Sequence, residues 1–152
     1  MSIEEKLNQM GLQIPEDTGV AGNYLPGVKT GNLVFLSGAI PKLPDGSLIC
    51  GKIGKQLTVE DGQQAAVQVT LNLLSNLKNI IGDLNKIERI IKVNGMINST
   101  SEFEDHPKVL NGCSDLLVQL FEERGLHARS AIGVSSLPFN VAIEIEMVIE
   151  VN

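Results

Sequence analysis

The sequence has few aromatic residues, few cysteines and no long apolar run, and each scarcity excludes a class of protein. It contains one tyrosine, four phenylalanines and no tryptophan, so the core must be built from aliphatic side chains. The two cysteines, Cys50 and Cys113, show no Cys-x-x-Cys spacing, and we expect two free, mostly buried thiols rather than a disulfide or a metal site. The longest apolar run, Leu33 to Leu36, is far shorter than the roughly 20 residues of a membrane span.

Basic residues are also scarce, which argues against a nucleic acid partner. Twelve Lys and Arg oppose 18 Asp and Glu, the net charge is −6, and no window concentrates the positive charge. RNA recognition calls for a basic groove and stacking aromatic rings. The acidic segment 1–15 also lacks the apolar stretch of a secretory signal, so we expect a cytoplasmic protein with no membrane contact.

What is present indicates a single domain spanning residues 1–152. The chain is 43% apolar and near the usual single-domain length. Ser2 and Glu5 form a capping box that predicts a short helix ending at Gly11, so residues 1–18 are interpreted as a peripheral N-terminal extension. The irregular segment 19–27 holds Tyr24, the single tyrosine.

Apolar periodicity predicts the remaining elements. A helix capped by Thr58 runs to Gly82, and a second runs from Pro107 to Gly125. The expected strands are Val28–Thr30 and Leu33–Ser37, joined by a Gly31-Asn32 turn, then Ile87–Ile97, Ala128–Leu137 and Val141–Val151. This order is typical of an α+β fold with both helices on one face of a single sheet.

The second face of such a sheet has no helix to cover it. Val141–Val151 alternates strictly, with carboxylates such as Glu144 on the side away from the core. We expect the small and apolar residues Ala131, Gly133 and Val148 on that same face. This mixture favours an interface between copies over open solvent.

The standard catalytic motifs are missing, and no cofactor is expected. The chain has no nucleotide-binding glycine motif, no His-Glu-x-x-His and no Gly-x-Ser-x-Gly. His106 follows Glu102, Glu104 and Asp105, which could in principle hold a hard cation, but we interpret this acidic segment as a solvated loop. No metal site is predicted.

Three residues stand out chemically, each with two readings. Arg129 stands among small and apolar residues at the start of a strand, where its rigid fork can clamp a small carboxylate or pair with an internal Glu. Glu144 is either a solvated or interface carboxylate or a base that positions water. His127 shares a face with Arg129 if the segment is extended, either as support or as a surface side chain.

Several segments, taken in order, resemble the RidA (YjgF-type, endoribonuclease L-PSP) family over about residues 19 to 151. The similarity is carried by the ordered set Gly22-Asn-Tyr24-Leu-Pro-Gly, Gly31 to Pro41 with its Ser37-Gly38 pair, Val109-Leu-Asn111, Gly125 to Pro138 around Arg129, and Val141 to Glu146. The resemblance implies a chorismate-mutase-like α+β fold and a homotrimer with sites in the clefts between subunits. It also implies hydrolysis of reactive enamines and imines, such as 2-aminoacrylate, to 2-keto acids and ammonia.

The resemblance also implies roles for particular residues. Arg129 matches the arginine that binds the substrate carboxylate, and Glu144 the glutamate that helps to place water. Tyr24 and Asn111 match pocket residues. Ala131 replaces the cysteine that commonly follows the Arg-Ser pair, at a position where the family uses the backbone carbonyl.

Departures from the family pattern mark a longer branch. Asn23 and His127 stand where the family has proline, and about four extra residues precede Asn111, so we expect a different substrate preference. The leading function is a cofactor-free deaminase of the 2-iminobutanoate/2-iminopropanoate type. The alternative is a non-catalytic trimer that binds or senses a small carboxylate metabolite such as a keto acid. Endoribonuclease activity ranks last because the chain lacks a basic groove.

Overall fold

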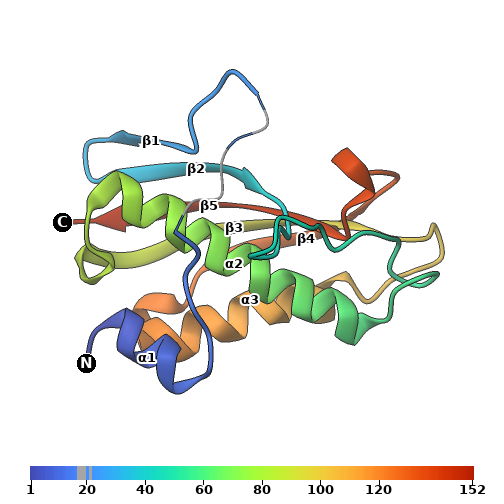
Figure 1. The fold of residues 1–152 in the computed structure, drawn as a ribbon, viewed down its shortest axis with the longest axis horizontal. Coiled ribbons are helices and arrows are strands. Elements are labelled where there is room, and N and C mark those ends of the chain that lie inside the picture. Colours follow the sequence, from blue (N-terminus) through green and yellow to red (C-terminus); the bar gives the residue numbers. More distant parts are fainter. Residues whose placement is uncertain (17–19, 21) are drawn as a thin grey trace.

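A computed structural model describes residues 1–16, 20 and 22–152, so Gly19 and Ala21 of the segment around Tyr24 lie outside the described residues (Figure 1). The helices are α1 (Ile3–Gln9), α2 (Val59–Ile81) and α3 (His106–Phe121). The strands are β1 (Gly27–Thr30), β2 (Leu33–Ala39), β3 (Ile87–Asn98), β4 (Ala128–Val134) and β5 (Ile143–Val151), with short 3-10 turns at Leu84–Lys86, Glu122–Gly125 and Pro138–Asn140.

The five strands form one mixed sheet in the order β1-β2-β5-β3-β4. All neighbouring strands are antiparallel except β3 and β4, which run parallel because α3 makes the crossover between them. Gly31, with φ of 57°, allows the tight turn between β1 and β2 that the sequence predicted. The edges of the sheet are β1 and β4.

Helices α2 and α3 pack side by side over one face of the sheet, as expected (Figure 1). Thr58 and Asp61 form a reciprocal capping box at the start of α2, which fixes where that helix begins. The two helices approach closely at Gly112, where an added Cβ would collide with the backbone carbonyl of Gln63. The core between the helices and the sheet is almost wholly aliphatic, and among the described residues Phe121 is the one fully buried aromatic ring.

Two expectations about burial are wrong. Helix α1 is not peripheral, because Ile3 and Leu7 are fully buried and the Lys6 ammonium donates to the Leu120 carbonyl at 3.0 Å. The two thiols also differ: Cys113 is buried, whereas Cys50 is exposed on the loop before α2. Burial raises the pKa of the Cys113 thiol to about 12, so this cysteine is a packing residue.

The face of the sheet opposite the helices carries apolar side chains, although two of those expected there lie elsewhere. Ala131 packs against the core, and a Cβ at Gly133 would collide with His106, so both residues face the helices. Val148 does lie on the open face, since it alternates with the buried Met147 and Ile149. Large apolar side chains share this face: Val28 and Phe35, in register with Val148, and Ile132 farther along on β4, which are 55%, 47% and 54% exposed. The open face thus remains a candidate interface.

Candidate functional site

Arg129 lies near the start of the edge strand β4, and its guanidinium is held against α3. Nη1 donates to Asn111 Oδ1 at 2.9 Å and to Ser114 Oγ at 3.1 Å, and Nη2 donates to the Pro107 carbonyl at 3.4 Å. Asn111 and Ser114 are three residues apart, so they share one face of α3. No carboxylate of the described residues forms an ion pair with Arg129. The structure therefore excludes, for these residues, the reading in which Arg129 pairs with an internal Glu.

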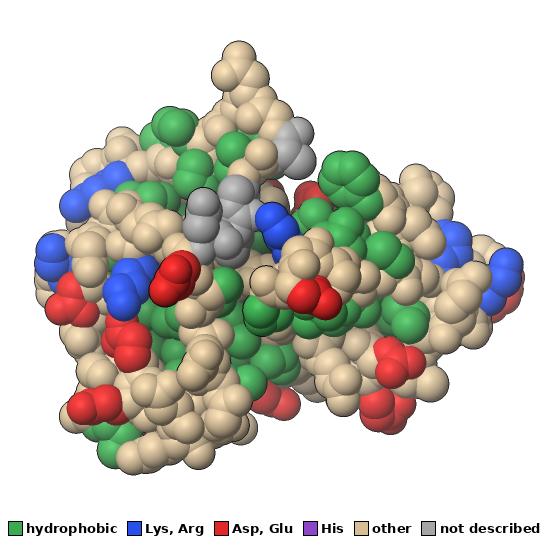
Figure 2. All heavy atoms as spheres, viewed as in Figure 1, with side chains coloured by type: hydrophobic (Ala, Val, Ile, Leu, Met, Phe, Trp, Pro, Cys, Tyr) green, Lys and Arg blue, Asp and Glu red, His purple; other side chains and the backbone are tan. Residues whose placement is uncertain are grey.

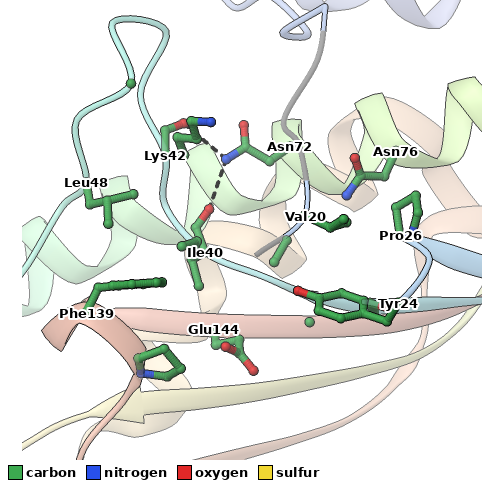
Figure 3. A pocket seen from close by; sticks show the side chains of 15 residues that line it. Val20, Tyr24, Pro26, Ile40, Lys42, Leu48, Asn72, Asn76, Phe139 and Glu144 are labelled. Atoms are coloured by element: carbon green, nitrogen blue, oxygen red, sulfur yellow. Dashed lines mark hydrogen bonds between the residues drawn. The ribbon is translucent and has the colours of Figure 1, made fainter. Parts of the chain in front are cut away.

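Tyr24 and Glu144 lie together at a hollow of about 490 Å³ on another part of the molecule (Figure 3). The Tyr24 ring extends along the hollow, and the Glu144 side chain lies below it in this view, on β5. The wall is largely apolar and carries a few polar groups. Its other lining residues are Val20, Pro26, Ser37, Gly38, Ala39, Ile40, Lys42, Gly46, Leu48, Asn72, Asn76, Pro138 and Phe139. Apolar walls with few polar groups are typical of small-molecule sites.

Hydrogen bonds from β2 place the Tyr24 loop beside Glu144. Ser37 donates from its hydroxyl to the Leu25 carbonyl at 2.6 Å and from its backbone N–H to the Pro26 carbonyl at 2.9 Å. A Cβ at position 38 would approach Glu144 Oε2 to 2.7 Å, so the glycine leaves the space that the carboxyl occupies. The Ser37-Gly38 pair thus holds the loop and leaves room for the carboxylate.

The far wall of the hollow is anchored by α2. The buried Asn72 donates through Nδ2 to the backbone carbonyls of Ile40 and Lys42, at 3.0 and 3.1 Å. These bonds tie the segment after β2 to the helix. Asn72 and Lys42 were not foreseen, because a single Asn within an apolar stripe and a Lys in a loop carry no local signal of a site.

Burial, and secondly the nearby Glu146 carboxylate, raise the pKa of the Glu144 carboxyl. A carboxyl whose pKa is higher in the folded chain than in the unfolded chain adds stability below the unfolded value of about 4.3, and that stability is lost as the pH rises through the folded value. Replacement of Glu144 by Gln should therefore raise the melting temperature relative to the parent more at about pH 7 than at about pH 4. Thermal unfolding at both pH values tests this, with Glu104→Gln, an exposed loop carboxylate, as the control. A melting-temperature difference between Glu144→Gln and the parent that shrinks as the pH rises would contradict the expectation.

Arg129 and Glu144 cannot meet one small substrate within a single chain. Glu144 belongs to the face opposite the helices, whereas Arg129 bonds to α3 on the helical face. In the register of the sheet, Arg129 of β4 lies opposite Val93 of β3, and Glu144 of β5 lies opposite Met96 of β3. The two residues are therefore separated by roughly 10 Å across two strand spacings and roughly 10 Å along the strands. The expected site residues form two groups: Arg129 with Asn111 and Ala131, and Glu144 with Tyr24.

The described residues contain no cluster of metal-binding side chains, and one face of the molecule shows no broad basic surface. No group of three or more His, Cys, Asp or Glu side chains among them could hold a metal. On the face shown in Figure 2, Lys and Arg side chains lie scattered among Asp and Glu, without a continuous basic patch. No described helix is long and apolar enough to cross a bilayer.

Comparison with known proteins shows the family. A model described as "YjgF/chorismate mutase-like, putative endoribonuclease" matches residues 4–151. Protein TCP17 of Trypanosoma cruzi is 37% identical over 151 residues, covering 99% of this chain and 94% of its own. A solved structure from Shewanella oneidensis, also described as "a putative endoribonuclease", superposes with a TM-score of 0.95 at 34% identity, covering 99% of this chain and all of the other. The chain belongs to the YjgF/RidA family and has its chorismate-mutase-like fold.

More distant relatives carry names that point to different functions. A 2-iminobutanoate/2-iminopropanoate deaminase of Dermatophagoides farinae is 29% identical over 130 residues, covering 84% of this chain and 85% of its own. A protein of Lactococcus lactis named "Putative regulator AldR" is 29% identical over 131 residues, covering 86% of this chain and 88% of its own. The family therefore includes both a named enzyme and a named regulator.

Proposed function

We propose that this protein hydrolyses reactive 2-imino acids, and their enamine tautomers, to 2-keto acids and ammonia. The observation that carries the proposal is the state of Arg129: it is oriented by neutral acceptors on α3, and no described carboxylate neutralises it. Such a guanidinium suits the carboxylate that every 2-imino acid bears. The relative named as a deaminase supports the same reaction.

In the proposed reaction Arg129 binds the substrate carboxylate, and water attacks the adjacent imine carbon. A C–O bond forms as the C=N electron pair moves to nitrogen, while Glu144 accepts one proton of the water and passes it to that nitrogen. Glu144 then takes the remaining hydroxyl proton of the adduct and passes it to the same nitrogen. The C–O bond becomes the keto C=O as the C–N bond breaks, and ammonia departs. The raised pKa makes the Glu144 carboxylate a stronger base, which suits a group that accepts a proton from water.

The reaction needs a second copy of the chain, because the imine carbon is only one bond from the carboxylate. Arg129 and Glu144 of one chain lie too far apart to touch both groups. A neighbouring chain packed against the edge strand β4 brings its own Glu144 and Tyr24 to this Arg129. The apolar side chains on the open face give the copies a surface to bury.

We therefore expect a closed trimer. Light scattering should give a mass of about 49 kDa, three times the 16.4 kDa of the chain. A monomer at micromolar concentration would leave Arg129 and Glu144 in separate places and contradict the shared site.

The direct test generates 2-aminoacrylate in situ and follows keto-acid release with and without the protein. The proposal predicts release above the buffer rate, which the endoribonuclease reading does not. If the protein binds keto acids but never exceeds the buffer rate over a range of imine side chains, it is instead a binding or sensing trimer. A relative is named as a regulator, which supports that second function.

A further inference from the structure

His127, which immediately precedes β4, lies in a continuous chain of hydrogen bonds that ends on Arg129. Its Nδ1 lies 2.6 Å from the Gly125 carbonyl, and its Nε2 lies 2.9 Å from Ser114 Oγ. A carbonyl oxygen only accepts, so Nδ1 carries the proton. In the neutral imidazole Nε2 is then an acceptor, and the Ser114 hydroxyl donates to it.

The direction of this bond leaves the oxygen of Ser114 as an acceptor facing Arg129. The hydroxyl uses its one O–H to donate a hydrogen bond to His127, so its lone pairs are free to accept a hydrogen bond from Nη1–H of Arg129 at 3.1 Å. Burial, and the positive charge of Arg129, lower the pKa of His127 against the opposing effect of the Gly125 carbonyl. The imidazole is thus neutral around pH 7, as the direction of the chain requires.

The consequence for Arg129 follows from its five N–H groups. Asn111 and Ser114 take the two on Nη1, and the Pro107 carbonyl takes one on Nη2. Among the described residues this leaves Nε–H and one Nη2–H without an acceptor. Nε and Nη2 share one edge of the guanidinium, and a carboxylate binds such an edge with both oxygens.

We propose that Ser114 and His127 are positioning residues, which turn the guanidinium of Arg129 so that its Nε/Nη2 edge receives a substrate carboxylate. The role rests on the function proposed above. It assigns His127, which the sequence left open between support and a surface side chain. It also gives a role to Ser114, which lies one turn of α3 beyond Asn111. The sequence analysis did not single out Ser114.

A matched pair of His127 variants tests this series of hydrogen bonds. Gln places an amide oxygen near the position of Nε2 and can accept from Ser114, whereas Asn reaches only the position of Nδ1. We expect His127→Asn and Ser114→Ala to weaken calorimetric binding of 2-oxobutanoate by roughly five- to twentyfold, and His127→Gln by about twofold or less. Binding of the uncharged 2-oxobutanamide should change in none of them.

A second readout separates this inference from the proposed function. Phenylglyoxal modifies exposed guanidinium groups, and peptide mass analysis resolves the three arginines: Arg89, Arg124 and Arg129. His127→Asn and Ser114→Ala should speed modification of Arg129 several-fold and leave Arg124, bonded to the Ile87 carbonyl, unchanged. If the parent binds no keto acid yet the Arg129 rates change, the proposed function fails and the positioning stands. If His127→Asn matches the parent in Arg129 modification, the positioning role is overturned.

Discussion

Replacement of Arg129 by Ala should abolish most of the affinity for 2-keto acids while leaving the fold intact. Among the described residues the side chain bonds only to Asn111, Ser114 and Pro107 at the edge of the sheet, and it is not one of the buried core residues. Loss of a charge-assisted bidentate contact costs about 1.5 to 3 kcal/mol, so binding should weaken roughly ten- to hundredfold. Calorimetric titration with 2-oxobutanoate measures the change, and circular dichroism checks the fold.

Two control variants separate geometry from charge. Arg129→Lys keeps the positive charge but lacks the planar fork, and we expect it to recover only part of the affinity. Lys55→Ala removes one positive charge from an exposed loop and should leave binding unchanged. An Arg129→Ala protein that binds as well as the parent would make Arg129 a structural residue.

Replacement of Glu144 by Gln should lower the rate of imine hydrolysis by a factor on the order of 10² to 10⁴, with much less effect on keto-acid affinity. Gln keeps the size and an acceptor oxygen but cannot take a proton from water. The position tolerates the change, since the carboxyl forms no ion pair within the described residues. Steady-state rates of keto-acid release, compared with calorimetric affinities, separate the two effects.

The matched control is Glu150→Gln, on the same face of the same strand. Glu150 accepts a hydrogen bond from Asn32 at 3.2 Å, far from the hollow that Tyr24 lines. Its substitution should leave the rate within about twofold of the parent. Undiminished turnover by Glu144→Gln would keep the enzyme but take the proton-transfer role from this carboxylate.

The fold was largely predictable from the sequence because its periodic signals are strong. The capping box at Thr58, the stripe of α2 and the strict alternation of β5 each place an element by local physics alone. Local patterns did not predict which side chains of β4 face the helices. Each side of this strand mixes polar with apolar residues, so the alternation carries no polarity signal, and only packing against α3 decides that Ala131 faces the core.

The site was predictable as a set of residues but not as an arrangement. Arg129, Glu144 and Tyr24 were singled out by odd local chemistry and by family resemblance. Their division into two groups depends on which face β4 presents and on the strand order, neither of which short sequence patterns encode. His127 shows the same limit, because its role depends on the hydroxyl of Ser114, brought to it by the packing of α3 on β4.

Complementation between two inactive variants tests most directly whether two chains build one site that hydrolyses imines. Arg129→Ala and Glu144→Gln chains, each with almost no activity alone, are dissociated, mixed in equal amounts and reassembled. In a closed ring with each site shared by neighbours, about one quarter of the sites regain both intact groups, so the mixture should recover about one quarter of the parent rate. A control mixture of Glu144→Gln with the double variant should recover nothing. A first mixture no more active than its two components would contradict the shared site.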